Sequence, residues 1–281
     1  PIQTNCYFLY REDTKECLII DPGYEADKIE AYVQKKQLHV AGILLTHGHF
    51  DHITAADEVR KKFQTKIYAS GKEKELMADP RMNVSVMMGD SVSLKADVWL
   101  EDGQELEMLG ETMRCILTPG HSPYHTCLYD EETKTMISGD VVLDDVIPIL
   151  FIEPDFDDPL GAYLDSLDKL EKIDIQHFMP GHGDINYDVN ARIEEIREHY
   201  EEKFKWINKQ LAEHGCMNSW ELADLLIQHD FKRSIDTVSA VSRWFFFLPV
   251  CACVRYMSAN GMITCTVSGN GVRYYDILQE K

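Results

Sequence analysis

The sequence is poor in basic side chains and has no long hydrophobic run. Its 281 residues include 28 lysines and arginines against 48 aspartates and glutamates, a formal net charge of −20. No uninterrupted apolar stretch reaches the roughly 18 residues that a membrane-spanning helix requires. The longest apolar run, residues 244–254, is shorter and contains Pro249. These absences argue against a membrane partner.

The acidic excess is concentrated in one part of the chain. Residues 1–185 hold 17 basic and 35 acidic side chains, a net charge of −18, and residues 186–281 hold 11 and 13, a net charge of −2. A phosphate polymer would be repelled by most of the first part. We therefore expect a small-molecule partner and not a nucleic acid.

The N-terminus has neither the basic region nor the apolar core of a secretory signal. Because the first residue is Pro1 and not methionine, a presequence removed earlier stays an open alternative. Eight cysteines in a chain of this length without a secretion signal are expected to be reduced thiols. The expected location is the cytoplasm.

Short apolar runs alternate with amphipathic stretches, a pattern typical of an α/β protein. The expected helices are at residues 26–37, 53–63, 160–170, 191–215 and 220–228, and a further one begins near residue 236 and runs toward residue 257, with a break at Pro249. The expected strands are at residues 5–10, 17–20, 40–45, 66–69, 98–100, 105–108, 112–117, 127–129, 135–137, 177–179, 262–267 and 272–278. Charge and periodicity change after residue 186, which predicts domains at 1–186 and 187–281.

The densest group of potential metal ligands follows the expected strand at residues 40–45. His47, His49, Asp51 and His52 fall within six positions, in the segment Thr-His-Gly-His-Phe-Asp-His. An extended backbone directs His47 and His49 to the same side. Imidazole and carboxylate groups at this density are costly to desolvate unless a partner offsets their charge. A bound metal is the simplest explanation.

Three more ligand-type residues recur in matching contexts downstream. His121, Asp140 and His182 each lie in a glycine-containing turn directly after an apolar run. Loops at the ends of rigid strands are where side chains from distant segments are held together. The repetition makes one shared site the better interpretation than isolated surface residues.

These motifs, with Asp21-Pro22-Gly23 upstream, resemble the metallo-β-lactamase-fold hydrolases, most closely the glyoxalase II-like branch. The resemblance covers residues 4 to 185. It implies an αββα sandwich and two divalent ions, zinc before iron or manganese, since histidine and aspartate ligands suit all three. It implies that His47, His49 and His121 hold the first metal, that Asp51, His52 and His182 hold the second, and that Asp140 bridges them. In this interpretation Asp51 and Asp140 are catalytic, and Asp21 supports a ligand histidine.

The resemblance favours hydrolysis of a small ester or thioester, as in hydroxyacylglutathione hydrolases. A β-lactamase-like endoribonuclease and a lactonase share the same motifs. A metal sensor without enzymatic activity is the alternative from another class. The acidic first domain disfavours the ribonuclease, and the intact ligand set disfavours the sensor.

Four further residues are candidates for a substrate pocket. His125 follows His121 by four positions, and Phe151, Phe156 and Tyr163 lie in or after an Asp- and Pro-rich stretch between Asp140 and His182.

The second domain combines helices with a hairpin signal at Asn270-Gly271, an order that resembles a winged helix. Its aromatic run at residues 244–247 favours a core position or a homodimer interface over nucleic-acid stacking.

Overall fold

The first five-stranded sheet has the order β1-β2-β3-β4-β5. The computed structural model describes residues 3–153, 155–185 and 188–278. β1 (Tyr7–Tyr10) is antiparallel to β2 (Glu16–Ile20). β3 (His39–Leu44), β4 (Ile67–Ser70) and β5 (Val98–Leu100) continue parallel to β2. The carboxyl ends of these four parallel strands therefore meet at one edge of the sheet.

The second sheet has the order β10-β9-β8-β7-β6. β6 (Glu105–Met108), β7 (Glu111–Leu117), β8 (Thr126–Asp130) and β9 (Thr135–Gly139) form an antiparallel meander. β10 (His177–Pro180) joins parallel to β9. Because β7, β9 and β10 run in the same direction, the loops that follow them leave the same edge.

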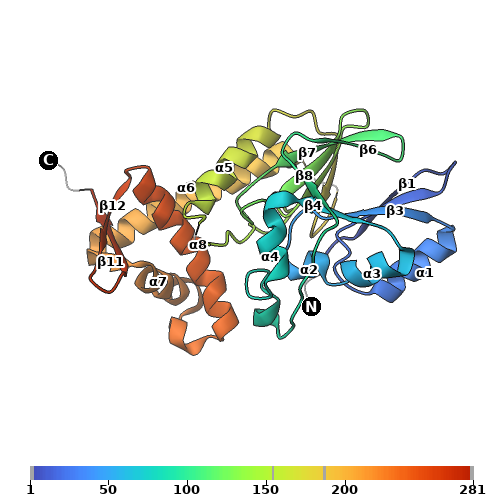
Figure 1. Cartoon of the computed structure of the whole chain (residues 1–281). Coiled ribbons are helices and arrows are strands. Elements are labelled where there is room, and N and C mark those ends of the chain that lie inside the picture. The colour runs from blue at the N-terminus through green and yellow to red at the C-terminus, as the bar shows by residue number, and fades with distance from the viewer. Residues whose placement is uncertain (1–2, 154, 186–187, 279–281) are drawn as a thin grey trace. The chain divides into compact units, whose positions relative to one another are not determined.

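Side-chain alternation along β2 shows how the layers pack. Cys17 and Ile19 belong to a core cluster with Ile29 and Val33 of α1 (Ala26–Lys36) and with residues of α3 (Ala56–Phe63). Leu18 and Ile20 face the other way, into a cluster with residues of β7, β8 and β9. Successive strand residues point to opposite faces, so β2 is buried on both. Figure 1 shows α1 and α3 side by side along the first sheet.

The expected helix at residues 53–63 is two helices, α2 (Phe50–Ile53) and α3. The Ala55 amide donates to the carbonyl oxygens of Pro22 at 3.0 Å and Gly23 at 3.1 Å, and this bond replaces the usual bond to the residue four positions earlier. Gly23 approaches so closely that an added Cβ would lie 1.8 Å from the Asp51 carbonyl oxygen. The break therefore results from a long-range contact.

Between β4 and β5 the chain forms η1 (Gly71–Glu73), α4 (Lys74–Ala78) and η2 (Ser85–Met88), none of which the sequence patterns predicted. α5 (Pro159–Leu170) agrees with the expected helix at residues 160–170. Ser166 Oγ donates to the Pro119 carbonyl at 2.8 Å and Lys169 Nζ to the Leu117 carbonyl at 3.0 Å. This half of α5 is thereby anchored to the end of β7.

The C-terminal region contains α6 (Val189–His214), α7 (Ser219–Phe231), η3 (Ile235–Thr237) and α8 (Ala240–Ala259). A three-stranded antiparallel sheet of β11 (Met217–Asn218), β13 (Arg273–Ile277) and β12 (Ile263–Val267) accompanies them. The hairpin expected at Asn270-Gly271 is present, and the Gly271 amide donates to the Ser268 carbonyl at 2.9 Å. The winged-helix interpretation stays a prediction.

α8 continues through Pro249, so the expected break there is wrong. Its length and composition alone would permit a membrane span, a property that the search for uninterrupted apolar runs missed. The helix also carries Arg243 and Arg255, and its second half, including Val250, Cys253 and Met257, is buried. This second half packs as the core of the C-terminal region.

The chain divides into two compact units. The first comprises residues 1–148 and 166–192, and the second comprises residues 149–165 and 193–281. The sequence predicts a single boundary after residue 186. It gives no indication that residues 149–165 belong to the second unit. Helices α5 and α6 each begin in one unit and end in the other.

Candidate metal centre

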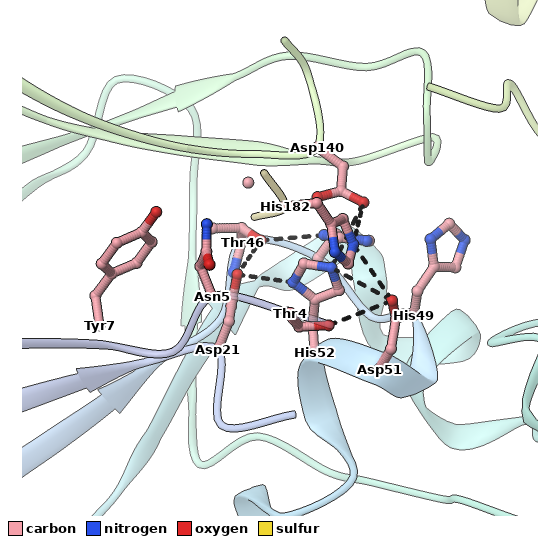
Figure 2. A network of polar contacts seen from close by, with 12 residues as sticks. Thr4, Asn5, Tyr7, Asp21, Thr46, His49, Asp51, His52, Asp140 and His182 are labelled. Carbon is pink, nitrogen blue, oxygen red and sulfur yellow. Dashed lines mark hydrogen bonds and ion pairs between the residues drawn. The ribbon is translucent and has the colours of Figure 1, made fainter. Parts of the chain in front are cut away.

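The ligand-type residues of the first unit gather at strand ends from both sheets. His47 and His49 follow β3, His121 follows β7, Asp140 directly follows β9, and His182 follows β10. Asp51 and His52 lie in α2, whose first turn starts right after His49. The structure thus brings together all seven residues that the motifs indicated. Figure 2 shows five of them, namely His49, Asp51, His52, Asp140 and His182.

Three overlapping groups have ligand atoms within 4.8 Å of one another: His47, His49 and His121; His47, His52 and Asp140; and Asp51, His52 and His182. Asp140 lies between the first and last groups. Its Oδ2 is 3.5 Å from His121 Nε2, 3.5 Å from His52 Nε2 and 3.2 Å from His182 Nε2. One carboxylate oxygen therefore faces histidines from both sets.

Burial leaves ligand atoms of this cluster without hydrogen-bond partners among the described residues. His47 is 1% exposed and Asp140 is 4% exposed, and neither His47 Nε2 nor Asp140 Oδ1 has such a partner. An unsatisfied buried polar atom is unfavourable unless something fills the position. The donor set of imidazole nitrogens and carboxylate oxygens fits a divalent metal.

Burial and neighbouring charges shift the pKa values of the cluster in opposite directions. Burial lowers the pKa of His47 well below its usual value, and the neighbouring histidines lower it further. Burial also lowers the pKa of His182, but hydrogen bonds to Asp140 and Asp51 outweigh it and raise that pKa to about 10. His52 behaves like His182, because Asp140, Asp51 and Asp21 raise its pKa well above the usual value despite burial. Bound metal would replace the protons held here.

Asp21 occupies the supporting position that the resemblance implied. Its Oδ2 is 2.9 Å from His52 Nδ1 and accepts a hydrogen bond from Thr46 Oγ1 at 2.6 Å, and its Oδ1 accepts from the Thr46 amide at 2.8 Å. This leaves His52 Nε2 directed at Asp140 (Figure 2). The sequence offered no signal for Thr46 beyond its place before His47.

His125, considered above as a substrate contact, is a fully buried neighbour of Asp140. Its Nε2 accepts the Asp140 amide at 3.0 Å, and its Nδ1 is 2.8 Å from Thr118 Oγ1. Burial lowers its pKa to about 3, so the ring is neutral. Gly139, with φ of 49°, permits this packing, because an added Cβ would lie 2.5 Å from His125 Nε2. Both ring nitrogens are therefore occupied within the protein.

The aromatic pocket candidates fall within residues 149–165 of the second unit. Tyr163 has no exposed area and packs edge-on against Tyr200 with ring centroids 6.2 Å apart, which makes it a core residue. Phe151 and Phe156 are half-buried. Their role in a substrate pocket stays a prediction.

The N-terminal segment holds the His182 loop, a role that sequence reasoning missed. Asn5 Nδ2 donates to the carbonyl oxygens of Pro180 and Gly183, each at 3.0 Å, and Tyr7 Oη donates to Pro180 at 2.5 Å. The Gln3 carbonyl lies 2.6 Å from His182 Nδ1 and accepts its proton. These contacts join residues more than 170 positions apart, and no local pattern marks them.

The two-sheet sandwich and the His/Asp cluster at its edge define a metallohydrolase. A family model described as "Metallo-beta-lactamase superfamily" matches residues 1–182, and the chain belongs to this superfamily. The family expected from the motifs is thus confirmed.

Similar proteins include a probable metallo-hydrolase, YqgX, from Bacillus subtilis, 44% identical over 144 residues, or 50% of this chain and 67% of that protein. The hydroxyacylglutathione hydrolase GloC from Haemophilus influenzae is 29% identical over 143 residues, again 50% of this chain and 67% of that protein. The crystal structure of a beta-lactamase domain protein from Burkholderia ambifaria shares the fold with a TM-score of 0.79 and 22% identity, covering 98% of this chain and 87% of that one.

Proposed function

We propose that the protein hydrolyses a small ester or thioester with the help of two divalent metal ions. His47, His49 and His121 would hold the first ion, Asp51, His52 and His182 the second, and Asp140 would touch both. The observation that carries this proposal is the position of Asp140 Oδ2, within 3.5 Å of ring nitrogens from both histidine sets. Zinc, iron and manganese all suit these ligands.

Two such ions, when bound, would supply a water of lowered pKa and Lewis acidity toward a carbonyl group. The chain supplies the geometry. Asp21 fixes the ring of His52, and His125 holds the backbone of Asp140. Asp51 Oδ2 lies 3.4 Å from His182 Nε2, which places a second carboxylate beside Asp140. Burial of His47 and Asp140 keeps bulk water away and strengthens these interactions.

Thioester hydrolysis is favoured among the alternatives by the similarity to GloC, which spans half of this chain. A lactonase would use the same ligands, so only substrate assays separate the two. An endoribonuclease conflicts with the composition of residues 1–185. This segment contains 17 basic and 35 acidic residues, and its net charge of −18 would repel RNA. A metal sensor would bind metal without turnover.

The first test is elemental analysis of the purified protein together with thioester, lactone and RNA cleavage assays, each with and without a chelator. We expect two metals per chain and chelator-sensitive loss of thioester. RNA cleavage alone would shift the function to a ribonuclease. Two metals without turnover of any substrate would favour the sensor.

Asp140→Ala tests the shared carboxylate. Removing an oxygen that faces both histidine sets should abolish hydrolysis and weaken both metals together, as measured by metal content after dialysis. Asp145→Ala, an exposed aspartate in the same loop, is the matched control. Full activity in Asp140→Ala, or loss of one metal alone, would contradict the bridging role.

A cytoplasmic location and a homodimer complete the proposal. All eight cysteines are free thiols, which suits a reducing compartment.

Trp244 and Phe245 are about half exposed, as an interface between copies would require. Sedimentation at micromolar concentration measures the oligomeric state, and a monomer would remove the dimer from the proposal.

A further inference from the structure

Glu73 is a fully buried carboxylate outside the metal-ligand motifs. It is the last residue of η1, directly after β4, and has 0% exposure. A buried carboxylate is costly unless donors surround it. Glu73 Oε1 accepts from Ser122 Oγ at 2.6 Å and from the Tyr124 amide at 3.2 Å, and Oε2 accepts from the Gly48 amide at 3.1 Å. These three donors give the burial a physical reason.

The donors belong to two ligand loops from different sheets. Gly48 lies between His47 and His49, in the loop after β3. Ser122 follows His121 directly, in the loop after β7. β4 is the parallel neighbour of β3, so its carboxyl end emerges beside the first loop. One carboxylate therefore joins the two loops that carry the first proposed ligand set.

Packing around Gly48 leaves its amide little freedom to move. An added Cβ would lie 2.6 Å from Leu76 Cδ2, 2.6 Å from Met77 Cγ and 3.0 Å from Glu73 Oε2. Leu76 and Met77 are buried residues of α4, the helix that follows Glu73. The short segment after β4 is thus shaped around the backbone between two ligand histidines.

We propose that Glu73 is a positioning residue for the first metal site, where it fixes the His47–His49 loop against the His121 loop. It is the counterpart of Asp21, which contacts His52 of the second set. The inference rests on the proposed two-metal function. It assigns to each metal site a buried carboxylate that positions the ligands but does not itself bind the metal.

Glu73→Gln is the sharpest variant because it keeps the side-chain volume. Only one end of the amide accepts hydrogen bonds, so its NH2 group must face either the Gly48 amide or the donors Ser122 and Tyr124. In the first case the Gly48 amide loses its acceptor. In the second case the Tyr124 amide loses its acceptor, whereas the Ser122 hydroxyl can turn to accept from the NH2 group. Glu75→Gln, an exposed glutamate two positions further in α4, is the matched control. Asp21→Asn is the corresponding variant at the second site.

The experiment titrates metal-free protein with Zn²⁺ against a chromophoric chelator to obtain two stepwise affinities. Histidine ring ¹⁵N resonances assign each step to its ligands. Loss of such supporting contacts typically costs ~10–100-fold in metal affinity. We expect that loss at the His47, His49 and His121 step in Glu73→Gln, with a much smaller change at the other step. Asp21→Asn should show the reverse, and Glu75→Gln should match the wild type.

Amide hydrogen exchange in the metal-free protein gives an independent readout. Exchange at Gly48 or Tyr124 should accelerate at least about tenfold in Glu73→Gln, because the amide loses its acceptor. Equal weakening of both metals, an unchanged first step, or unchanged exchange would overturn the positioning role. A wild-type protein that binds fewer than two metals would instead refute the proposed function itself.

Discussion

Buried negative charge is concentrated in a few carboxylates, and each of them requires a positively charged partner. Asp21, Asp51 and Asp140 are each at most 6% exposed, and they are surrounded by histidines. Burial raises the pKa of Asp140, but His52, His182 and His121 outweigh it and hold the pKa well below its usual value. Asp140 is therefore ionised, and metal binding releases the protons that His52 and His182 carry. Metal affinity should fall as the pH is lowered.

Gly48→Ala tests the close packing between two ligand histidines. The new methyl group would meet the side chains of Leu76 and Met77 at 2.6 Å, so either these side chains or the His47–His49 backbone must shift. A shift of ~1 Å at a reacting centre can cost about 10²-fold in rate. We expect a loss of that order in thioester hydrolysis, with the first metal weakened more than the second. Gly269→Ala, where an added Cβ meets no atom within 4 Å, is the control.

Wild-type activity in Gly48→Ala would show that the His47–His49 loop tolerates displacement, and would argue against a rigid first site.

At the scale of elements, caps and local contacts decide where helices begin. α7 begins at Ser219, one residue before the start of the helix expected at residues 220–228, and Asn218 is its cap. The Asn218 side-chain oxygen accepts hydrogen bonds from the backbone amides of Trp220 and Glu221. In return, the Glu221 carboxylate accepts a hydrogen bond from the backbone amide of Asn218. This reciprocal arrangement is a capping box.

Asn218→Ala removes that cap and should lower the free energy of unfolding by about 1 kcal/mol. Urea denaturation followed by circular dichroism measures the change. Asn218→Ser, which keeps a side-chain acceptor, should recover most of the loss. If alanine and serine variants are equally stable, the capping box contributes nothing measurable.

Glu153, in residues 149–165 of the second unit, predicts a pH dependence of stability. Burial raises its pKa from 4.5 to about 7. The folded state thus keeps a proton that the unfolded chain releases near pH 4.5, so the contribution of Glu153 to the free energy of unfolding falls between about pH 4.5 and pH 7 and is constant above. Glu153→Gln stays neutral at every pH. It should melt higher than wild type above pH 7 and equal it below pH 4.5.

Thermal melts of the metal-free protein at several pH values check this prediction, with the exposed Glu202→Gln as control. The same pH profile for Glu153→Gln and wild type would mean that Glu153 is ionised when folded.

At the scale of the whole molecule, charge decides which partners can approach. The net charge of −20 repels phosphate polymers at long range. We expect no gel shift with single- or double-stranded RNA at ~0.15 M salt, and none created by lowering the salt several-fold. A basic RNA-binding protein serves as positive control. A shift that weakens steeply with added salt would restore the nucleic-acid alternative.

Much of the candidate site was readable from the sequence because its proposed ligands lie close together along the chain or beside glycine turns. The spacing of His47, His49, Asp51 and His52 depends only on local backbone geometry. Each distal ligand, such as His121, follows an apolar strand and a turn. The αββα class and the superfamily followed from the same motifs and are confirmed. Local chemistry was sufficient for these conclusions.

Only the tertiary structure decided which residues support the ligands. Glu73 sits in a segment with no recognisable pattern, yet it binds loops 25 and 49 positions away. His125, one of the candidates for the substrate pocket, holds the Asp140 amide, a contact that no motif indicated. The helix break at Ala55 comes from Pro22 and Gly23. Hydrogen bonds between distant segments leave no periodic trace in a sequence, because they depend on how the sheets place strand ends in space.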